Sequence, residues 1–492
     1  MTETAKKKRG MPSSFTILLA LLAIVAVITV IVSGTSGGEV TAARLSDFCT
    51  APILGFADAL PVCLFVMILG GFLGMMTETG ALDNGIAVLV QKLKGNEIML
   101  VPVLMLIFSL GGTTYGMCEE TVPFYALLAA TMMAAGFDPM VGAATVLLGA
   151  GCGCLGSTVN PFAVGAAVDA LTGVDIAVNQ SIIIGLGGVL WLVTTVMSIV
   201  FVMNYAKKVK ADKGSTILSM QELEDAEAAH GKAASEVNKE VKLTGRQKGV
   251  LIAFAFTFVV MIVGFIPLAD LNEGVANFFD AGAVYDADGN TVVQGWSALI
   301  TGLPIGQWYF DEASTWFFLM AILIGIIGGL SEKQIVNTFI TGAADMMSVV
   351  LVIALARGIS VLMANTGLDV YVLDAAANAL AGLSGVIFAP MSFLVYFGLS
   401  FLIPSTSGMA TVSMPIMGPL AVKLGFSPEV MVMIFSAAIG VVNLFTPTSG
   451  AIMGGLALAK IEWTTWLKFA LKLIVALSVV CAVILTIACV ML

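Results

Sequence analysis

Two related polar stretches interrupt long apolar runs; they read GGTTYGMCEETVP at residues 111–123 and PSTSGMATVSMP at residues 404–415. Each stretch places a Gly-Met pair seven residues before a proline. Two further breaks follow them, GSTVNP at residues 156–161 and FTPTSG at residues 445–450. Inside a membrane, non-helical backbone is tolerated only where protein or a water-filled cavity satisfies its N–H and C=O groups. Interrupted segments at matching places in two halves of a chain are typical of a transporter's binding site.

The composition points to a membrane protein. Hydrophobic residues make up 59% of the 492 residues, charged residues only 11%, and the mean hydropathy is +1.03. Soluble domains carry roughly 25% charged residues. We therefore expect an all-α polytopic membrane protein in contact with lipid. The sequence has neither a basic stripe nor a nucleic-acid-reading motif, so no nucleic-acid partner is expected.

The apolar runs predict nine membrane crossings and two re-entrant hairpins. The arms around the first polar stretch look too short to cross, because a crossing helix needs about 20 residues, and the first arm is predicted to break at Gly111. Lysines before the first run predict a cytoplasmic N-terminus. The predicted regions are residues 1–34 (N-terminal tail and first transmembrane helix), 35–204 (first repeat, with a hairpin over about 97–136 and a broken helix over about 139–171), 205–248 (cytoplasmic linker), 249–314 (an extra transmembrane helix and an outer loop) and 315–492 (second repeat, with a hairpin over about 384–424 and a broken helix over about 427–460).

The linker is rich in charged residues and is predicted to be partly helical, without a core of its own. It carries the only histidine of the chain, His230. A single histidine in a charged loop has no partner for catalysis or for metal binding. We therefore expect His230 to be a solvated surface residue.

Matching residues in the two halves indicate an internal repeat. Asp58 matches Asp345 at an offset of 287, the two Gly-Met pairs match at 292, and Leu155 matches Leu444 at 289. The extra helix near residue 249 reverses the orientation of the second copy. Inverted repeats are therefore expected, as in alternating-access transporters. Asp58 and Asp345 lie near expected helix starts and are predicted to cap them, with a part in transport as the other interpretation.

Several motifs resemble those of a known family. The stretches GGTTYGMCEETVPFY, GSTVNPF, ARGI and PSTSGMA are similar to those of the YfcC branch of the DcuC-like carriers, in the ion transporter superfamily. The resemblance covers most of the chain outside the linker and the outer loop. It implies a two-hairpin fold, a homodimer in the bacterial cytoplasmic (inner) membrane, and an elevator motion of a mobile domain against a scaffold. The substrates that it implies are a basic amino acid moved by exchange, of the arginine/ornithine type, or a C4-dicarboxylate.

Hydroxyl and amide side chains gather at the hairpin tips and helix breaks. They can coordinate Na⁺ or hydrogen-bond a substrate, and the N-termini of half-helices offer N–H groups to a carboxylate. The other interpretation is that they only satisfy neighbouring backbone. Na⁺ or H⁺ is the expected coupling ion, and no other cofactor is expected. Sites for Na⁺ are predicted near Thr114, Ser157 and Asn160, and near Ser407 and Thr448. The candidate substrate-binding residues of this kind are Thr113, Thr114, Ser157, Thr158, Asn160, Ser405, Thr406, Ser407, Thr446, Thr448 and Ser449.

Three charged residues complete the candidate site. Glu119 and Glu120 follow the first tip, and buried acids in membranes are costly and usually functional. They can bind an ammonium or guanidinium group or carry a coupling proton, or one of them can cap the second arm. Arg357 lies in the middle of an apolar run. It can bind a substrate carboxylate, or form an ion pair with Asp345 or a glutamate.

These features favour a secondary active transporter for a small amino-acid-like solute, foremost a basic amino acid taken by exchange. A C4-dicarboxylate carrier of the same fold, coupled to Na⁺ or H⁺, is the alternative. A channel or a membrane enzyme is a third class. The sequence argues against an enzyme, because it has no His/Asp metal cluster and no Ser-His arrangement, and the absence of a Walker motif argues against an ATP-driven pump.

Overall fold

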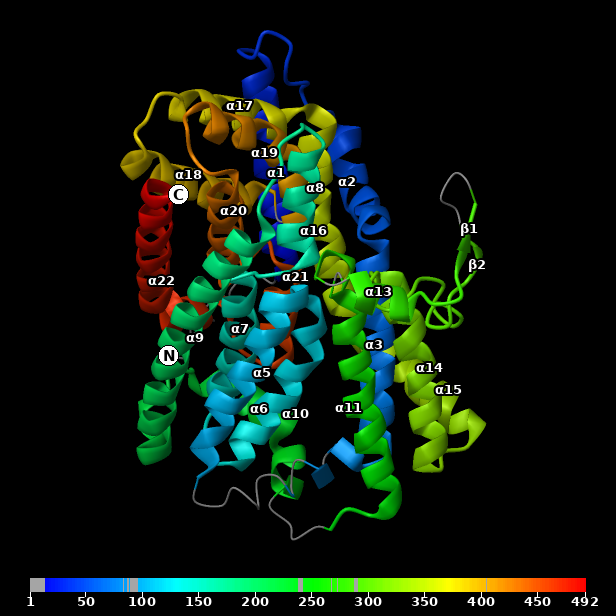
Figure 1. Ribbon diagram of the computed structural model, residues 1–492. Coiled ribbons are helices and arrows are strands. Elements are labelled where there is room, and N and C mark those ends of the chain that lie inside the picture. Colours follow the sequence, from blue (N-terminus) through cyan, green and yellow to red (C-terminus); the bar gives the residue numbers. More distant parts are fainter. Residues whose placement is uncertain are drawn as a thin grey trace, which may run out of the picture.

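The computed structural model describes residues 14–82, 84–85, 88, 96–237, 242–266, 268–271, 273–286, 291–403 and 405–492. Most of the predicted N-terminal tail, and Pro404 of the second polar stretch, lie outside the described residues. Within them the chain is helical apart from loops and one short antiparallel pair of strands, β1 (Val284–Tyr285) and β2 (Thr291–Val293) (Figure 1). This pair lies in the predicted outer loop, together with the short helices α12 (Leu268–Leu271) and α13 (Glu273–Phe279).

Eight helices of the described chain are long and apolar enough to cross a membrane, which makes this a multi-pass membrane protein. Seven of them coincide with runs predicted to cross without a break, and the eighth belongs to the first hairpin. The eight are α1 (Ser14–Ser33), α3 (Leu60–Glu78), η1 (Glu97–Met99) continued by α5 (Leu100–Tyr115), α9 (Gln180–Ala211), α11 (Gly245–Phe265), α14 (Phe310–Gly328), α16 (Met347–Thr366) and α22 (Trp463–Met491).

The first hairpin differs from its prediction in where the break begins. Helix α5 continues through Gly111 and Gly112 to Tyr115, and its C-cap Gly116 has a left-handed φ of 80°. The expected break at Gly111 and the expected short arm are therefore wrong. The reason is packing: a Cβ on Gly112 would lie 2.2 Å from the carbonyl oxygen of Ala150 in α7 (Pro139–Leu155). These glycines permit close backbone contact between helices. The second arm is α6 (Val122–Ala134), after a 3₁₀ turn, η2 (Glu119–Thr121).

The other interrupted elements lie where they were predicted. The second hairpin consists of α18 (Gly385–Leu402) and α19 (Thr406–Lys423). The first broken helix consists of α7, a π-helical turn η3 (Pro161–Gly165) and α8 (Ala166–Thr172). The second consists of α20 (Pro428–Val442) and α21 (Gly450–Leu458). Proline explains the first break, because it lacks an N–H and clashes with the preceding turn.

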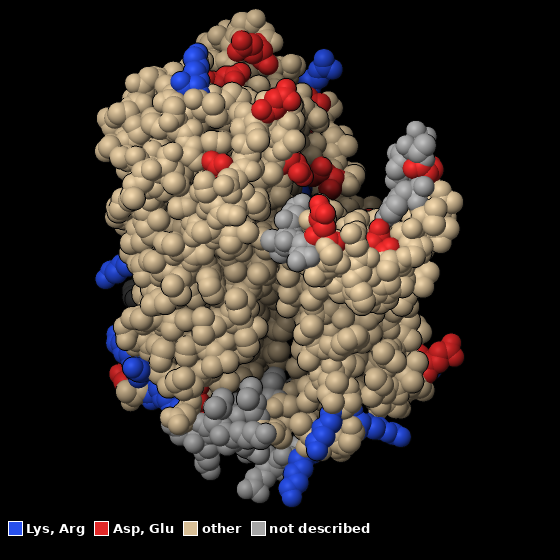
Figure 2. Space-filling view, viewed as in Figure 1, with Lys and Arg blue, Asp and Glu red and all other residues tan. Residues whose placement is uncertain are grey.

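The helices form two groups, which we call the hairpin group and the frame group. The hairpin group contains both hairpins, both broken helices, α9 and α22, which pack on one another. The frame group contains α2 (Leu45–Asp58), α3, α11, α14, α15 (Glu332–Asp345) and α16, with α1 packed on α16. Helix α17 (Leu368–Leu380) connects α16 to the second hairpin. Figure 1 shows α3, α11, α14 and α15 beside α5–α7, and Figure 2 shows a furrow between the two groups.

Two glycine contacts hold the frame group together. A Cβ on Gly55 of α2 would lie 2.3 Å from a backbone oxygen of α16, and a Cβ on Gly70 of α3 would lie 2.5 Å from the carbonyl oxygen of Gly342 in α15. Asp58 and Asp345 are the last residues of α2 and α15, so the prediction that they cap helix starts is wrong. A single residue separates each of these helices from the next one. Each aspartate therefore ends the helix before this connecting residue and does not lie at the start of the helix after it.

The linker has a packed face that was not predicted. Its helix α10 (Met220–Val237) packs on α6 and buries Glu222, Ala226 and His230 at a spacing of four residues, which places them on one side of the helix. His230 is only 8% exposed, and its Nε2 lies 3.0 Å from the carbonyl oxygen of Leu458. The expectation of a solvated histidine is therefore wrong. The side of α10 that packs on α6 has polar residues at both ends, so its sequence resembles that of a charged loop.

Candidate substrate-binding cavity

A cavity of about 470 Å³ lies where the hairpin group meets the frame group. Both hairpin tips and both helix breaks line it from one side. The junction of α2 and α3, the start of α14 and the middle of α16 line it from the other. The predicted site residues that line it are Glu119, Glu120, Asn160, Arg357, Ser405, Thr406, Ser407, Thr448 and Ser449. Those outside its lining are Thr113, Thr114, Ser157, Thr158 and Thr446.

Three of the residues outside the lining bond to backbone at the first break, and two of them, Thr113 and Thr158, join it to the first tip. Thr113 donates from Oγ1 to the carbonyl oxygen of Gly156 at 2.6 Å, and Thr158 donates to that of Thr113 at 3.0 Å. Ser157 donates to the carbonyl oxygen of Cys154 at 2.6 Å. These hydroxyls satisfy backbone that the breaks leave unpaired, as the second interpretation of the sequence stated. Their part is to hold the lining in place.

The first predicted Na⁺ site consists of groups that are already hydrogen-bonded to one another or to backbone. Thr114 donates to the carbonyl oxygen of Leu110 at 2.6 Å and lies outside the cavity lining. The amide of Asn160 donates to Ser157 Oγ at 2.9 Å, and its oxygen accepts from the backbone N–H of Phe162 at 2.9 Å. Asn160 therefore acts as the N-cap of η3.

The second predicted Na⁺ site is more open to the cavity. Ser407 and Thr448 both line the cavity, and Thr448 Oγ1 lies 2.7 Å from Thr446 Oγ1. Thr446 is fully buried and supports Thr448 from behind.

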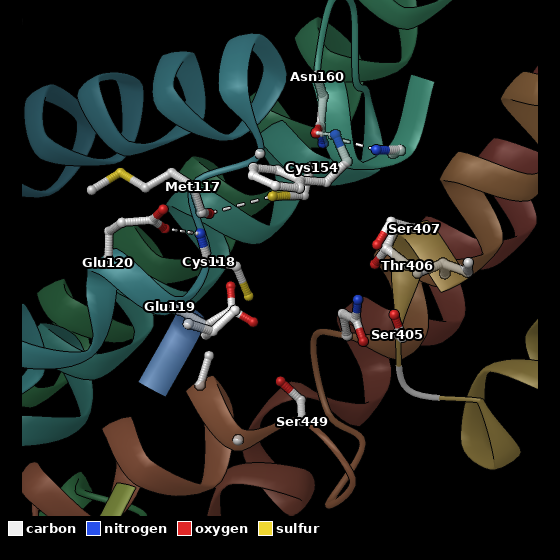
Figure 3. A pocket seen from close by; sticks show the side chains of 18 of the residues that line it. Met117, Cys118, Glu119, Glu120, Cys154, Asn160, Ser405, Thr406, Ser407 and Ser449 are labelled. Carbon is white, nitrogen blue, oxygen red and sulfur yellow. Dashed lines mark hydrogen bonds between the residues drawn. The ribbon is translucent and has the colours of Figure 1, made fainter. Parts of the chain in front are cut away.

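The two neighbouring acids have different surroundings. Glu120 is 1% exposed, and its Oε2 accepts from the backbone N–H of Cys118 at 3.0 Å, so it satisfies the turn that carries it. Glu119 is half-buried and points into the space between the hairpin tips, toward Ser405 and Ser449 (Figure 3). Of the two, Glu119 is therefore the one placed to meet a solute.

Several helix N-termini meet at the cavity, and they are capped differently. The N-cap of α19, Ser405, accepts from the N–H of Gly408 at 3.1 Å, and Asn160 caps η3. The N-cap of α21, Ser449, makes no side-chain cap hydrogen bond among the described residues. The first residues of α21 also line the cavity. An uncapped N-terminus offers N–H groups and a partial positive charge to an anion.

Arg357 is paired within the frame group. Its Nε lies 3.5 Å from Asp58 Oδ2, and both residues line the cavity. The prediction that Arg357 pairs with Asp345 is wrong. Asp58 ends α2, which packs along α16, whereas Asp345 ends α15, which packs on α3. Among the described lining residues, Arg357 is the only one with a positive charge. The carboxylates there are Asp58, Glu119, Glu120 and Asp169.

Sequence reasoning missed several polar residues of the lining, among them Asp169, Ser436 and Asn443. Ser436 is 2% exposed, and its hydroxyl has no hydrogen-bond partner among the described residues. The sequence signal that could have identified Ser436 is that it is the single serine inside the apolar half-helix α20, one and a half turns before the break. Asn443 follows the last residue of that half-helix.

A second cavity, of about 690 Å³, lies between α3 and α15 on one side and α6 and α10 on the other. Glu78, Asp345 and His230 line it, together with threonines of α6 and α15. An apolar cluster that includes Cys63, Val122 and Val349 joins the two groups of helices. Members of this cluster line both cavities, so the cluster lies between them.

Apolar helices, two hairpins and two broken helices around a cavity with charged and polar lining residues define a multi-pass membrane transporter. The sequence matches the C4-dicarboxylate anaerobic carrier (DcuC) family over residues 39–490, and the chain belongs to this family. The resemblance noted in the sequence is thereby confirmed.

Two relatives were found among curated proteins. The chain is 29% identical over 443 residues to an uncharacterised protein of Haemophilus influenzae, covering 90% of this chain and 78% of the relative. It is 27% identical over 440 residues to a protein of Escherichia coli K12 described as a putative basic amino acid antiporter, YfcC, covering 87% and 77% of the two chains. The family and the second relative are transporters by description.

Among solved structures, the chain is similar to MtrF of Neisseria gonorrhoeae, described among antimetabolite efflux pumps, and to the YdaH transporter of Alcanivorax borkumensis. MtrF is 17% identical with a TM-score of 0.44, over 98% of this chain and 96% of that chain. YdaH is 16% identical with a TM-score of 0.45, over 97% and 98%.

Proposed function

We propose that the protein exchanges small cationic amino acids, of the arginine/ornithine type, across the bacterial cytoplasmic membrane. The observation that carries the proposal is the charge of the cavity: four carboxylates and one guanidinium among its described lining residues. A charged group inside a membrane protein is stabilised by an opposite charge and is costly without one. An excess of carboxylates therefore favours a cationic solute.

The two ends of such a solute have separate partners in the proposal. Its guanidinium or side-chain ammonium group binds Glu119, which points into the cavity. Its α-carboxylate binds at the N-terminus of α21, where Ser449 leaves the backbone N–H groups without a side-chain cap among the described residues. Glu120 stays with its own turn, and Arg357 stays with Asp58.

A C4-dicarboxylate is the second candidate, supported by the description of the family. Arg357 and the helix N-termini would suit an anion. Glu119 would repel a dianion unless it were protonated, and the cavity offers a single basic side chain among the described lining residues to set against it. The charge balance thus favours the cation.

Alternating access by inverted repeats is part of the proposal, and the element bounds support it. Helices α15 and α16 begin 287 residues after α2 and α3 begin. Helix α2 packs on α16 and α3 packs on α15, so each copy packs its first helix on the second helix of the other. Cys63 Sγ contacts the carbonyl oxygen of Val350, its own match at an offset of 287, at 3.8 Å. Contacts between matched residues are expected close to a two-fold axis.

In the proposed mechanism the hairpin group moves as an elevator against the frame group, in a homodimer whose N-terminus is cytoplasmic. Lysines and arginines gather at the lower end of the face in Figure 2, which supports a cytoplasmic position for that end. Exchange needs no coupling ion when one cation replaces another; Na⁺ or H⁺ coupling belongs to the dicarboxylate alternative.

Exchange in proteoliposomes tests the proposal. Labelled arginine is offered to vesicles loaded with ornithine, arginine, succinate or buffer, with and without a Na⁺ gradient. We expect uptake only into vesicles that hold a basic amino acid, independent of Na⁺. Succinate uptake that depends on Na⁺, without arginine uptake, would replace the proposal by the dicarboxylate alternative.

A further inference from the structure

Arg357 has a position that substrate binding alone does not explain. It extends from α16 of the frame group into the cavity, where Asp58, also of the frame group, lies 3.5 Å from its Nε. A charge-assisted hydrogen bond is shorter, about 2.7–2.9 Å. Asp58 therefore keeps Arg357 near the cavity without fully satisfying its guanidinium, which has five N–H donors.

The opposite charge belongs to the other group of helices. Glu119 lies on the tip of the first hairpin and points into the same cavity. Arg357 and Glu119 both line this cavity, one from each group of helices, so their opposite charges face the same space. An attraction between these two residues thus crosses the boundary between the hairpin group and the frame group.

We infer that Arg357 makes the transport an obligatory exchange, because its charge, kept at the cavity by Asp58, is the counter-charge of Glu119 whenever no substrate cation is bound. This inference rests on the proposed function, in which a substrate cation binds Glu119. With the cavity empty, moving the hairpin group past the frame would separate Glu119 from its counter-charge in a poorly solvated place, which is unfavourable. A bound cation replaces Arg357 as the counter-charge of Glu119, while Arg357 keeps its pair with Asp58. The loaded protein can then move, and the empty protein cannot.

The repeat supports a device that is present only once. At an offset of 287 the position of Arg357 matches Gly70, and at 292 the position of Glu119 matches Thr411. Neither partner of the charge pair has a charged counterpart in the other half. A substrate contact shared by both halves would be expected to recur, whereas a charge pair across the boundary needs to occur only once.

The test compares arginine uptake into vesicles loaded with arginine and into vesicles holding buffer. Wild-type protein should give a ratio of empty to loaded uptake near zero. Arg357→Gln should raise that ratio by at least about tenfold, the change produced by a barrier lower by ~1.4 kcal/mol. Arg357→Lys should restore exchange, because it restores the charge. Arg246→Gln, which removes an exposed arginine of α11 outside the cavity, is the matched control and should keep the wild-type ratio.

Every other outcome overturns the inference. An unchanged ratio in Arg357→Gln would do so, and so would loss of arginine binding in a thermal-shift assay, which would make Arg357 a substrate ligand. If Arg357→Gln does not fold, Asp58→Asn is the second test of the inference. This variant removes the negative charge that competes with Glu119 for Arg357, so exchange should slow while the ratio of empty to loaded uptake stays near zero. A raised ratio in Asp58→Asn would contradict the inference. Wild-type vesicles that take up no arginine under any load would remove the proposed function, and this inference with it.

Discussion

Adjacent glutamates at one hairpin tip differ in what they contact, although the sequence presents them as a pair. Glu120 is buried and accepts a hydrogen bond from the backbone of its own turn, whereas Glu119 faces the cavity. The same carboxylate chemistry thus has two uses one residue apart. A substitution series at these positions separates support of the tip from contact with the solute.

Glu119→Gln should weaken arginine binding by roughly tenfold or more, because a hydrogen bond to a charged group contributes about 1.5–3 kcal/mol. Glu120→Gln should leave the affinity nearly unchanged and lower the thermal stability, since it weakens a buried cap of its turn. Arginine titration and thermal unfolding of the purified variants measure both quantities. Equal losses of affinity in the two variants would contradict the separate uses of these acids.

At the scale of elements, α10 connects the linker to the base of the second broken helix. Its Glu222 Oε1 accepts from the backbone N–H of Glu462 at 2.9 Å, and His230 contacts the carbonyl oxygen of Leu458 at 3.0 Å. Between these two contacts lies Lys460, which has a left-handed φ of 61°. Left-handed backbone is uncommon for a residue with a side chain. Two side chains of α10 therefore stabilise the turn between α21 and α22 from both sides.

The docking of α10 should weaken in acid. Burial, with Lys460 nearby, lowers the pKa of His230 from its usual value of 6.5, and the contact with Leu458 opposes this only in part. The undocked histidine therefore takes up a proton at a higher pH than the docked one. Docking is fully stable above about pH 6.5 and loses stability as the pH falls below it.

Hydrogen exchange of the α10 amides at pH 7.5 and pH 5.5 measures this loss. His230→Ala should weaken docking by ~1 kcal/mol, the net value of one hydrogen bond, and should remove the dependence on pH. Glu224→Gln, an exposed position on the same helix, is the control and should retain it. A pH dependence that persists in His230→Ala would assign the titration to another group.

At the scale of the whole molecule, the boundary between the hairpin group and the frame group includes both cavities and the apolar cluster between them. Helix α21 packs on α16 across this boundary. A Cβ on Gly454 of α21 would lie 3.2 Å from Val349 Cβ of α16. Disulfides have Cβ atoms about 3.5–4.5 Å apart, so a cysteine pair here can be closed with a small adjustment.

In a background without native cysteines, oxidation of the pair Val349→Cys and Gly454→Cys should stop arginine exchange, and reduction should restore it. The reason is that the disulfide joins two bodies that must move past each other. The pair Gly325→Cys and Ile335→Cys is the control; a Cβ on Gly325 would lie 2.7 Å from Ile335 Cγ1, within the frame group. Its oxidation should leave exchange intact. Full exchange by the oxidised first pair would show that the two groups do not separate there.

The amino-acid sequence alone predicted the membrane class and the positions of the hairpins and of most of the breaks. These follow from hydropathy, from proline and glycine, and from chain spacing, which are local properties. Local properties also misplaced the end of α5, because Gly111 and Gly112 serve close packing on α7 rather than a break.

The packing of the helices, which the sequence does not reveal, determines which polar residues of the breaks face the cavity and which satisfy backbone. Thr113 and Ser405 both belong to hairpin tips, yet Thr113 bonds to Gly156 while Ser405 lines the cavity. The partner of Arg357, the buried hydroxyl of Ser436 and the docking of His230 depend in the same way on which helices pack together. Such contacts join residues far apart in the chain, and no local pattern encodes them.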